Sequence, residues 1–463
     1  MRLDQYKYLV LQILLCVSIT AAYYYTALDN FFILDDFYIL VANGGGVKAA
    51  LFGTPNLRIL GNFIIWLIFE CFGLNHFGYN AFSIVVHCVN LTIIYLLLKK
   101  ITDDERFSVI ASIIFAGMSV YCDAILYKAA VATVVNVTFY SFTLLLYLKG
   151  KDHIRFYYWS VLTFFFGMFI KEEIASLPIM LLFIEIFIFE NAGGLRSILK
   201  KIIPYVAIVI VYIAASILQS RYNNVLQHEF EKASQFKLMR SLFGGFYSFF
   251  LRPDSVLTDH NLLLFSLLLP VLFTLAICIN KNRKMLLFGF AWVIIAFLPQ
   301  SYSTNTLLNS QFIAASMSRH LYLPSIGAAI VIASILLFSS RHLNVYAGKA
   351  MVFVVLSLLL LYNGSLVHER SHQWGWNTAT VETKLFLWSL KAAIPQFESG
   401  AHILVDNPPA GRAEMSGAIG AFWHNQVVYV DDLAHFDVDN IKVLYLIGNR
   451  LASGQHVTVT RLK

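Results

Sequence analysis

The sequence predicts an all-α polytopic membrane protein with about eleven transmembrane helices and a small C-terminal α/β domain on the outer face. Three observations predict it. Of the 463 residues, 58% are hydrophobic and only 13% are charged, which is unlike a soluble domain of this size. Apolar segments of helix length recur as far as residue 367. After that residue, short apolar segments alternate with polar ones, as strands and helices do in small α/β domains.

The apolar segments predict the membrane spans in chain order. A span needs roughly 20 residues to cross the bilayer core, and several of these segments are a little shorter, so their ends are predicted only to within a few residues. The first segment lacks a small-residue cleavage site, which favours a retained anchor over a signal peptide. The predicted spans are 8–26, 77–98, 106–121, 129–148, 155–170, 174–190, 202–219, 261–279, 285–299, 321–338 and 350–367.

The basic residues predict the direction of insertion. Lysine pairs such as Lys99 and Lys100, or Lys200 and Lys201, fall in loops on the same side as the N-terminus. Cytoplasmic loops are enriched in Lys and Arg, so we expect a cytoplasmic N-terminus and an extracytoplasmic C-terminus. These residues signal topology and indicate no nucleic acid partner. The short outer loops hold fewer cations, namely Lys48, Arg58, Lys128, Lys171 and Arg319.

Three pieces are expected on the outer face. The first is the loop 27–76, whose apolar segment 57–72 we predict to lie at the interface, because a crossing there would move the lysine-rich loops outside. The second is the polar loop 220–260. The third is the outer domain 368–463, which follows the transmembrane domain 1–367. It is predicted to hold a helix at 374–391 and strands at 402–406, 426–430, 442–447 and 456–460.

Two adjacent carboxylates, Asp35 and Asp36, stand between aromatic and aliphatic residues just after the first span. Bringing like charges together at a membrane interface is costly, and proteins retain such pairs mainly for chemistry or ion binding. The alternative is that the pair caps the following helix and stays solvated.

On the predicted topology, other charged residues fall on the same side as this pair. Asp123 lies in the loop after the third span, Arg58 opens the segment 57–72, and Lys171 with Glu172 and Arg319 with His320 sit at the outer ends of two other spans. Such a set suits a reaction between a hydroxyl and a lipid-linked phosphate. A carboxylate takes the proton from the attacking hydroxyl, and cations neutralise the departing phosphate.

Structural alternatives exist for several of these residues. Lys171 could form a local salt bridge with Glu172 or Glu173 that merely ends a helix. Arg319 could extend along the interface to place its charge in water. His87 and Asn90 lie inside the second span, where interhelical hydrogen bonds are the more common role of such residues.

Several motifs occur in the order found in one superfamily. They are Asp35-Asp36, Arg58-Ile-Leu, the turn from Phe72 to Gly78, His87-Cys-Val-Asn90, Asp123, Lys171-Glu-Glu-Ile-Ala-Ser-Leu-Pro178 and Arg319-His-Leu-Tyr-Leu-Pro324. Over residues 20–395 the chain resembles the GT-C glycosyltransferases that use polyprenyl-phosphate sugars. It is similar to the protein O-mannosyltransferase, transmembrane-and-TPR mannosyltransferase and aminoarabinose transferase families. It departs from their pattern at Ile59, which replaces a proline, at His320, which replaces an aromatic residue, and at Ser318, where an acid is common.

The resemblance implies roles for the site residues. It implies catalytic roles for Asp35, Asp36 and Asp123, with Asp35 favoured as the base. It implies that Lys171, Arg319 and Arg58 bind the donor phosphate. It implies supporting roles for four other members of the motifs, namely Glu172, His320, His87 and Tyr322.

The implied activity is transfer of a sugar from an undecaprenyl-phosphate carrier to a hydroxyl of an extracytoplasmic acceptor. A bacterial inner-membrane hexosyltransferase with a periplasmic site is expected, acting on an envelope glycan such as O-antigen or lipopolysaccharide. A protein acceptor is the alternative. A transporter or flippase of lipid-linked glycans is disfavoured, because the charges gather at one interface rather than at mid-membrane. The cysteines show no metal-ligand spacing and no cofactor is indicated, although a divalent cation is left open.

Overall fold

A computed structural model describes residues 3–52, 57–189, 194–223, 283–299, 318–373, 378–424, 427–430, 441–449 and 457–462. The predicted span 261–279 and residues 224–260 of the predicted outer loop lie outside this part of the chain. The chain forms two compact units, each built from separate segments. The first unit is Met1–Tyr25, Pro55–Gly61 and Phe82–Val367. The second is Thr26–Thr54, Asn62–Ala81 and His368–Lys463.

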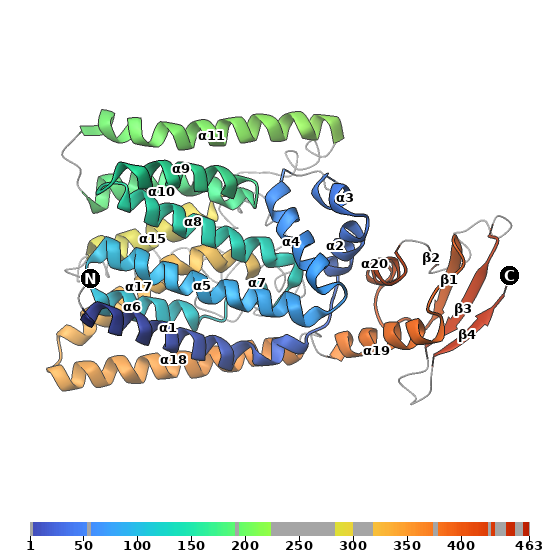
Figure 1. The fold of residues 1–463 in the computed structure, drawn as a ribbon. Coiled ribbons are helices and arrows are strands. Elements are labelled where there is room, and N and C mark those ends of the chain that lie inside the picture. The colour runs from blue at the N-terminus through green and yellow to red at the C-terminus, as the bar shows by residue number, and fades with distance from the viewer. Residues whose placement is uncertain are drawn as a thin grey trace, which may run out of the picture. The chain divides into compact units, whose positions relative to one another are not determined.

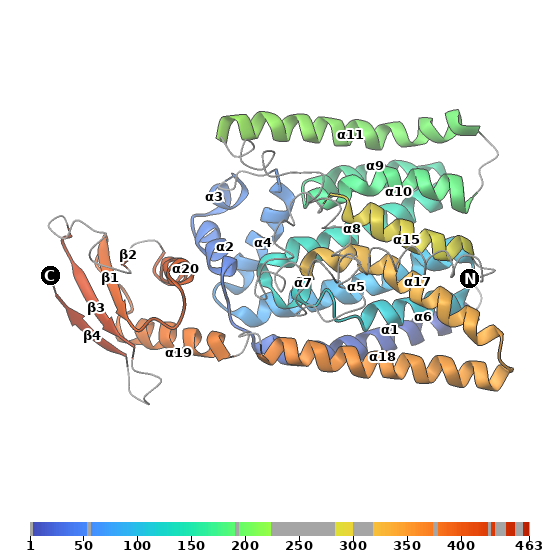
Figure 2. The ribbon, with the colours of Figure 1, turned by 180° about the vertical axis from the view of Figure 1, so that it is seen from behind.

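Long helices lying alongside one another make up the first unit (Figures 1 and 2). Ten of the predicted spans fall on them, which confirms the helical membrane class. The helices are α1 (Leu3–Tyr24), α5 (His76–Thr102), α6 (Glu105–Ala116), α8 (Val131–Lys149), α9 (Ile154–Met168), α10 (Leu177–Phe183), α11 (Gly194–Asn223), α15 (Arg283–Phe297), α17 (Tyr322–Arg341) and α18 (Val345–Gln373). The span predicted as one helix over 174–190 is instead three pieces, since the 3-10 helix η3 (Glu172–Ser176) precedes α10 and the π-helix η4 (Ile184–Ile188) follows it.

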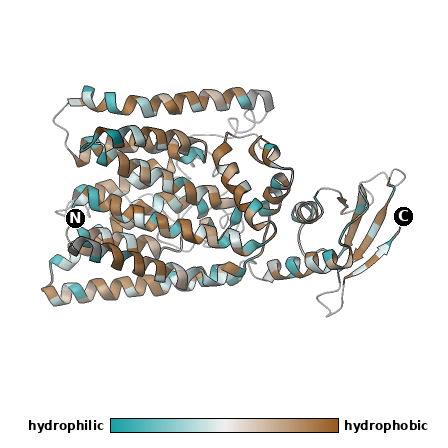
Figure 3. Ribbon diagram, in the orientation of Figure 1, coloured by the Kyte–Doolittle hydropathy of each residue, from teal (hydrophilic) through white to brown (hydrophobic). Residues whose placement is uncertain are grey.

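Six helices of the described chain are long and apolar enough to cross a membrane. Figure 3 shows hydrophobic residues along most of the length of these helices. The core of the unit is packed closely where α15 meets α17. A Cβ at Gly289 would lie 2.8 Å from the carbonyl oxygen of Gly327, and a Cβ at Gly327 would lie 2.5 Å from the carbonyl oxygen of Gly289. Only glycine permits this approach of two backbones, as is common where membrane helices pack.

The second unit contains short helices from the first predicted outer loop. These are the 3-10 helix η1 (Tyr25–Asp29), α2 (Asp35–Gly44), α3 (Val47–Phe52) and most of α4 (Ile59–Phe72). The helix expected over 57–72 is α4, and its depth relative to the bilayer stays a prediction. The structure thus groups much of this loop with the C-terminal segment, whereas the sequence grouped it with the spans.

The C-terminal segment adds a small α/β layer to this unit. Its elements are α19 (Thr378–Ala393), β1 (Ala401–Asp406), α20 (Arg412–Phe422), β2 (Val427–Val430), β3 (Leu444–Gly448) and β4 (Thr458–Arg461). The strand order is β2-β1-β3-β4. Strand β1 pairs in parallel with β2 and β3, so that Ile403 stands opposite Tyr429 and Tyr445, and β4 is antiparallel to β3. Helix α20 makes the crossover between β1 and β2 that a parallel pair requires. All four predicted strands are therefore confirmed.

Candidate functional site

The two adjacent aspartates occupy different environments in the turn that opens α2. The backbone N–H of Asp36 donates to the carbonyl of Ile33 at 2.9 Å, which closes the turn. The Asp36 side chain is buried and accepts a hydrogen bond from the N–H of Ile33 at 3.1 Å. Asp35, one residue earlier, is exposed. Asp36 therefore stabilises the turn, whereas the Asp35 side chain is exposed.

Leu34 gives this turn an unusual backbone. Its φ of 46° and ψ of −120° lie in a region that residues with a side chain rarely adopt. Holding a residue there costs about 1–3 kcal/mol and persists only where the surroundings impose it. The conformation sets the direction in which the next residue, Asp35, leaves the turn.

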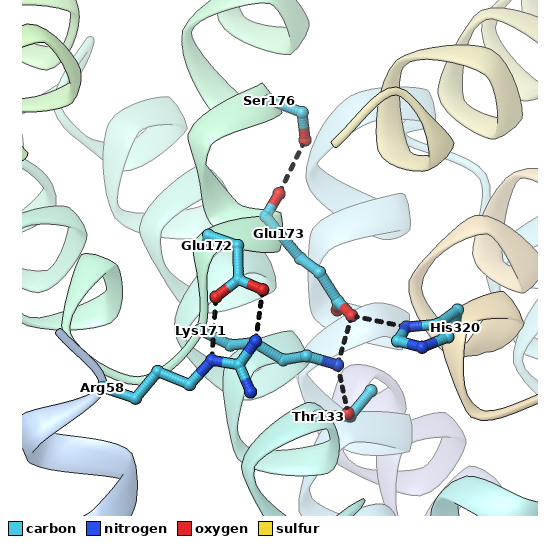
Figure 4. A network of polar contacts seen from close by, with 7 residues as sticks. All are labelled: Arg58, Thr133, Lys171, Glu172, Glu173, Ser176 and His320. Carbon is cyan, nitrogen blue, oxygen red and sulfur yellow. Dashed lines mark hydrogen bonds and ion pairs between the residues drawn. The ribbon is translucent and has the colours of Figure 1, made fainter. Parts of the chain in front are cut away.

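Lys171 lies between α9 and η3 and is buried against its neighbours (Figure 4). Its ammonium lies 2.5 Å from a carboxylate oxygen of Glu173 and donates to the Thr133 hydroxyl of α8 at 2.7 Å. The side chains of Lys171 and Glu173 are only 5% and 2% exposed. Of the two local salt bridges weighed for Lys171, the structure forms the one with Glu173.

The charges in this pair follow from burial and proximity. Burial by itself raises the pKa of Glu173, but the Lys171 ammonium and the His320 ring outweigh it and lower that pKa to about 2. Burial lowers the pKa of Lys171, and Glu173 opposes that change. We take the pair as charged, because the carboxyl pKa lies far below that of an ammonium group.

Arg58 reaches the same region from the start of α4 (Figure 4). The N–H groups of Leu60 and Gly61 donate to the carbonyl of Phe169 at 2.9 and 3.1 Å, and a Cβ at Gly61 would lie 2.6 Å from the carbonyl oxygen of Ile170. This close backbone contact brings the Arg58 guanidinium to Glu172. Its Nε donates to Oε2 at 2.9 Å, and a second bond joins Nη2 to Oε1.

The Arg58–Glu172 pair is more open to its surroundings than the Lys171–Glu173 pair. The two side chains are 32% and 40% exposed. Burial lowers the pKa of Arg58, but Glu172, with smaller effects of Glu173 and Tyr212, raises it above its ordinary value. Burial raises the pKa of Glu172, but Arg58 and Lys171 lower it below its ordinary value. Both groups therefore carry their charge.

The turn η5 (Ser318–Leu321) connects Asp123 with this cluster. The Ser318 hydroxyl donates to Oδ2 of Asp123 at 2.6 Å, and Nδ1 of His320 lies 3.4 Å from Oε1 of Glu173. An acid in place of Ser318 would put a second carboxylate against Asp123, whereas the hydroxyl supplies a donor. The departure from the family pattern at Ser318 thus suits the buried Asp123 of this chain.

Arg319 differs from the other two predicted phosphate-binding cations. Its guanidinium lies over the ring of Tyr127, with 5.2 Å from the guanidinium carbon to the ring centroid. The side chain is partly exposed. Among the residues that the structure describes, Arg319 forms no ion pair, while Arg58 and Lys171 each pair with a glutamate.

His87 and Tyr322 lie together inside the helix bundle. Nδ1 of His87 is 2.6 Å from the Tyr322 hydroxyl, which also accepts from the Asn90 amide at 3.1 Å. Aromatic rings of Tyr24, Phe115 and Tyr121 surround the His87 ring. These contacts join α5 to the start of α17, which is the interhelical role weighed for His87 and Asn90 from the sequence.

The structure brings together Arg58, Lys171, Glu172, Asp123, Arg319 and His320 in the first unit and adds three residues that had no assigned role. These are Glu173, Thr133 and Ser318. The adjacent glutamates 172 and 173 could have indicated two pairs for two cations, but no sequence signal distinguishes Thr133 from other hydroxyls in apolar spans. In the described ranges, no three or more His, Cys, Asp or Glu side chains are close enough to hold a metal ion together.

Two comparisons with known proteins found matches. Residues 55–218 match the family model described as dolichyl-phosphate-mannose-protein mannosyltransferase. No curated protein matches the sequence. The solved structure of ArnT from Cupriavidus metallidurans, bound to undecaprenyl phosphate, has a TM-score of 0.52 at 11% identity, with 97% of each chain covered.

A second solved structure has a larger chain. It is the archaeal oligosaccharyltransferase AglB from Archaeoglobus fulgidus, in complex with an inhibitory peptide and a dolichol-phosphate. Its TM-score is 0.48 at 11% identity, and the match covers 92% of this chain but only 64% of AglB.

The structural match to ArnT covers nearly all of both chains, and the sequence motifs occur in the expected order. These observations lead to one assignment: this chain has the fold of the GT-C superfamily.

Proposed function

We propose that the protein is an integral-membrane glycosyltransferase that moves a sugar from a polyprenyl-phosphate carrier, such as undecaprenyl phosphate, to a hydroxyl of an extracytoplasmic acceptor. The observation that carries the proposal is the match to ArnT over nearly the whole of both chains. An exposed Asp35 in the turn that opens α2 and a partly exposed Arg319 support it, because the reaction needs a base and a cation.

The reaction assigns one task to each group. Asp35 takes the proton of the acceptor hydroxyl while the hydroxyl oxygen attacks the anomeric carbon of the donor sugar. The bond from that carbon to the phosphate oxygen breaks, and polyprenyl phosphate departs with the electron pair. It needs no proton from a general acid, because it leaves as a stable anion. Arg319, Arg58 and Lys171 neutralise the anion, and Asp123 orients the acceptor or the donor sugar.

We further propose a bacterial inner-membrane location with a cytoplasmic N-terminus and a periplasmic site. The acceptor would be an envelope glycan such as O-antigen or lipopolysaccharide, and the transferred group a hexose. A second candidate is a protein acceptor, which the description of the family model that matches residues 55–218 favours. Purified protein offered polyprenyl-phosphate hexoses together with either glycan or peptide acceptors would separate the two. A transporter of lipid-linked glycans would give no transferred product with any acceptor.

The base assignment is tested by two matched variants. Asp35→Asn keeps the size of an exposed side chain and removes its basicity, so transfer should fall by about 10²–10⁴-fold. Asp36→Asn keeps an oxygen that can accept from Ile33, so its loss of rate should be smaller. Initial rates at saturating donor would be measured for both proteins. Full activity in both variants would refute a base in this turn.

A further inference from the structure

Helix α20, from the C-terminal segment, packs against α2 within the second unit. The contact is close because α20 carries glycine at the point of approach. A Cβ at Gly417 would lie only 3.1 Å from Cβ of Phe37, a side chain that is fully buried. Phe31, just before the Asp35 turn, lies edge-on to Phe422 at the end of α20, with ring centroids 6.4 Å apart. The segment that holds the aspartate turn therefore packs against α20 through aromatic side chains.

A polar contact from α20 reaches the turn itself. The Glu414 carboxylate accepts a hydrogen bond from the backbone N–H of Leu34. The preceding N–H, that of Ile33, donates to Asp36. Two successive backbone donors are therefore held by two carboxylates, one from the turn and one from α20. Burial raises the pKa of Glu414, and the Leu34 N–H opposes that rise.

These contacts explain why Leu34 keeps a positive φ. A leucine at φ 46° departs from the backbone that it would adopt alone, so its surroundings must impose the conformation. The local sequence supplies Asp36 and the bond that closes the turn. The neighbouring helix α20 supplies a further restraint through Glu414 and through the approach that Gly417 permits.

We propose that Glu414 and Gly417 of α20 are positioning residues for glycosyl transfer, which hold the Leu34 turn so that Asp35 faces the acceptor hydroxyl. The inference rests on the proposed function, since it needs Asp35 as the base. It assigns a role in the reaction to the C-terminal segment. The effect acts through orientation, and small displacements of a catalytic group can cost large factors in rate.

The test compares three substitutions on α20 in the full-length protein. Glu414→Ala removes the acceptor for the Leu34 N–H and should lower kcat for transfer by about tenfold or more. Glu414→Gln keeps a carbonyl oxygen that can accept the same bond, so it should retain most of the rate. Ser416→Ala, an exposed site on the same helix, is the matched control and should behave as wild type. Donor affinity should be unchanged in all three.

Repeating Glu414→Ala in the Asp35→Asn background distinguishes a positioning role from a merely structural one. The loss of transfer rate is compared between the two backgrounds. A residue that acts only through Asp35 should cause no further loss there, whereas general destabilisation would lower the residual rate in both backgrounds. Unchanged kcat in Glu414→Ala, or an equal loss with and without Asp35, would overturn the inference. If Asp35→Asn were fully active, the proposed base would fail instead. If the Glu414→Ala protein does not accumulate, Gly417→Ala takes its place in the same test. That substitution adds one methyl group against Phe37.

Discussion

Two of the three cations assigned to the donor phosphate are held by glutamates in the structure. Arg58 is bound by Glu172 through two bonds, and the buried Lys171 is paired with Glu173. A donor phosphate would have to compete with Glu172 for Arg58, and with Glu173 for Lys171. Arg319, stacked on Tyr127, has no such competitor among the described residues. At the scale of single residues, Arg319 is therefore the strongest candidate to meet the donor.

Substitution of Arg319 should weaken donor binding more than substitution of Arg58. Loss of charge-assisted hydrogen bonds worth about 1.5–3 kcal/mol predicts a roughly 10–100-fold higher Kd for Arg319→Ala. Binding would be measured with a non-hydrolysable polyprenyl-phosphate analogue. Arg341→Ala, an exposed site at the other end of α17, is the control. Equal affinity of Arg319→Ala and wild type would contradict the assignment.

The low pKa of Glu173 predicts how stability depends on pH. The folded pKa of about 2 lies below the ordinary value of 4.5, so the stabilisation is fully present above that ordinary value. It is lost as pH falls from about 4.5 towards 2. Glu173→Gln should therefore be clearly less stable than wild type at pH 6, where it leaves the buried Lys171 without its carboxylate.

The gap in unfolding temperature between Glu173→Gln and wild type should narrow at pH 3. Thermal unfolding in detergent at the two pH values would measure it. Glu398→Gln is the matched control, because its partner Arg461 and Glu398 itself are both about half exposed, and such pairs contribute little. A gap that stays constant between pH 6 and pH 3 would argue against a charged Lys171–Glu173 pair.

At the scale of elements, apolar length predicted the helices well because the bilayer imposes it on the sequence. The breaks within a span were not predictable in this way. The change from η3 through α10 to η4 within 172–188 occurs in a run that is apolar after Glu173 except at Ser176 and Glu185, so hydropathy does not reveal it. The strands of the C-terminal sheet were predictable because each is a short apolar run between turn residues. Their order β2-β1-β3-β4 depends on pairing across the chain and left no local signal.

The contact between α15 and α17 gives a prediction at this scale. Gly327→Val places a branched side chain where a Cβ alone would lie 2.5 Å from the Gly289 carbonyl oxygen, so the two helices must separate. The protein should unfold at a clearly lower temperature, because overpacking of this kind typically costs about 1–3 kcal/mol. Ile335→Val, an exposed position on the same helix, should change little. An unchanged unfolding temperature for Gly327→Val would show that the helices do not meet at these glycines.

At the scale of the whole molecule, the sequence predicted a membrane part and an outer part, and the structure divides the chain along different lines. The second unit takes Thr26–Thr54 and Asn62–Ala81 from the N-terminal region as well as the C-terminal segment. No sequence pattern indicates this grouping, because it depends on contacts such as that of Gly417 with Phe37. The candidate cations, by contrast, were predicted to gather because Lys171 and Arg319 stand at the ends of spans and Arg58 opens the segment 57–72, all on one predicted side of the membrane.

Membrane topology is the prediction for the molecule as a whole. With the protein's own cysteines replaced by serine, a cysteine at the exposed position Ser416 should react with a membrane-impermeant thiol reagent applied from outside. A cysteine at the exposed Lys349, in a loop predicted to be cytoplasmic, should react only after permeabilisation. The reverse pattern would place the C-terminal segment in the cytoplasm and invert the proposed orientation.

The packing of α20 on α2 also bears on how the protein is made. Glu414 follows Leu34 by 380 residues (414 minus 34), and nearly all of the transmembrane helices are synthesised between them. Until α20 emerges from the ribosome, the apolar side of α2 that includes Phe37 lacks its neighbour. The nascent chain must therefore carry this short helix without α20 while the membrane helices are synthesised, with Phe31 and Phe32 as local neighbours of Phe37. Aggregation and recognition by chaperones during biogenesis are expected to centre on α2, and completion of the fold there awaits a helix that is translated after the membrane helices.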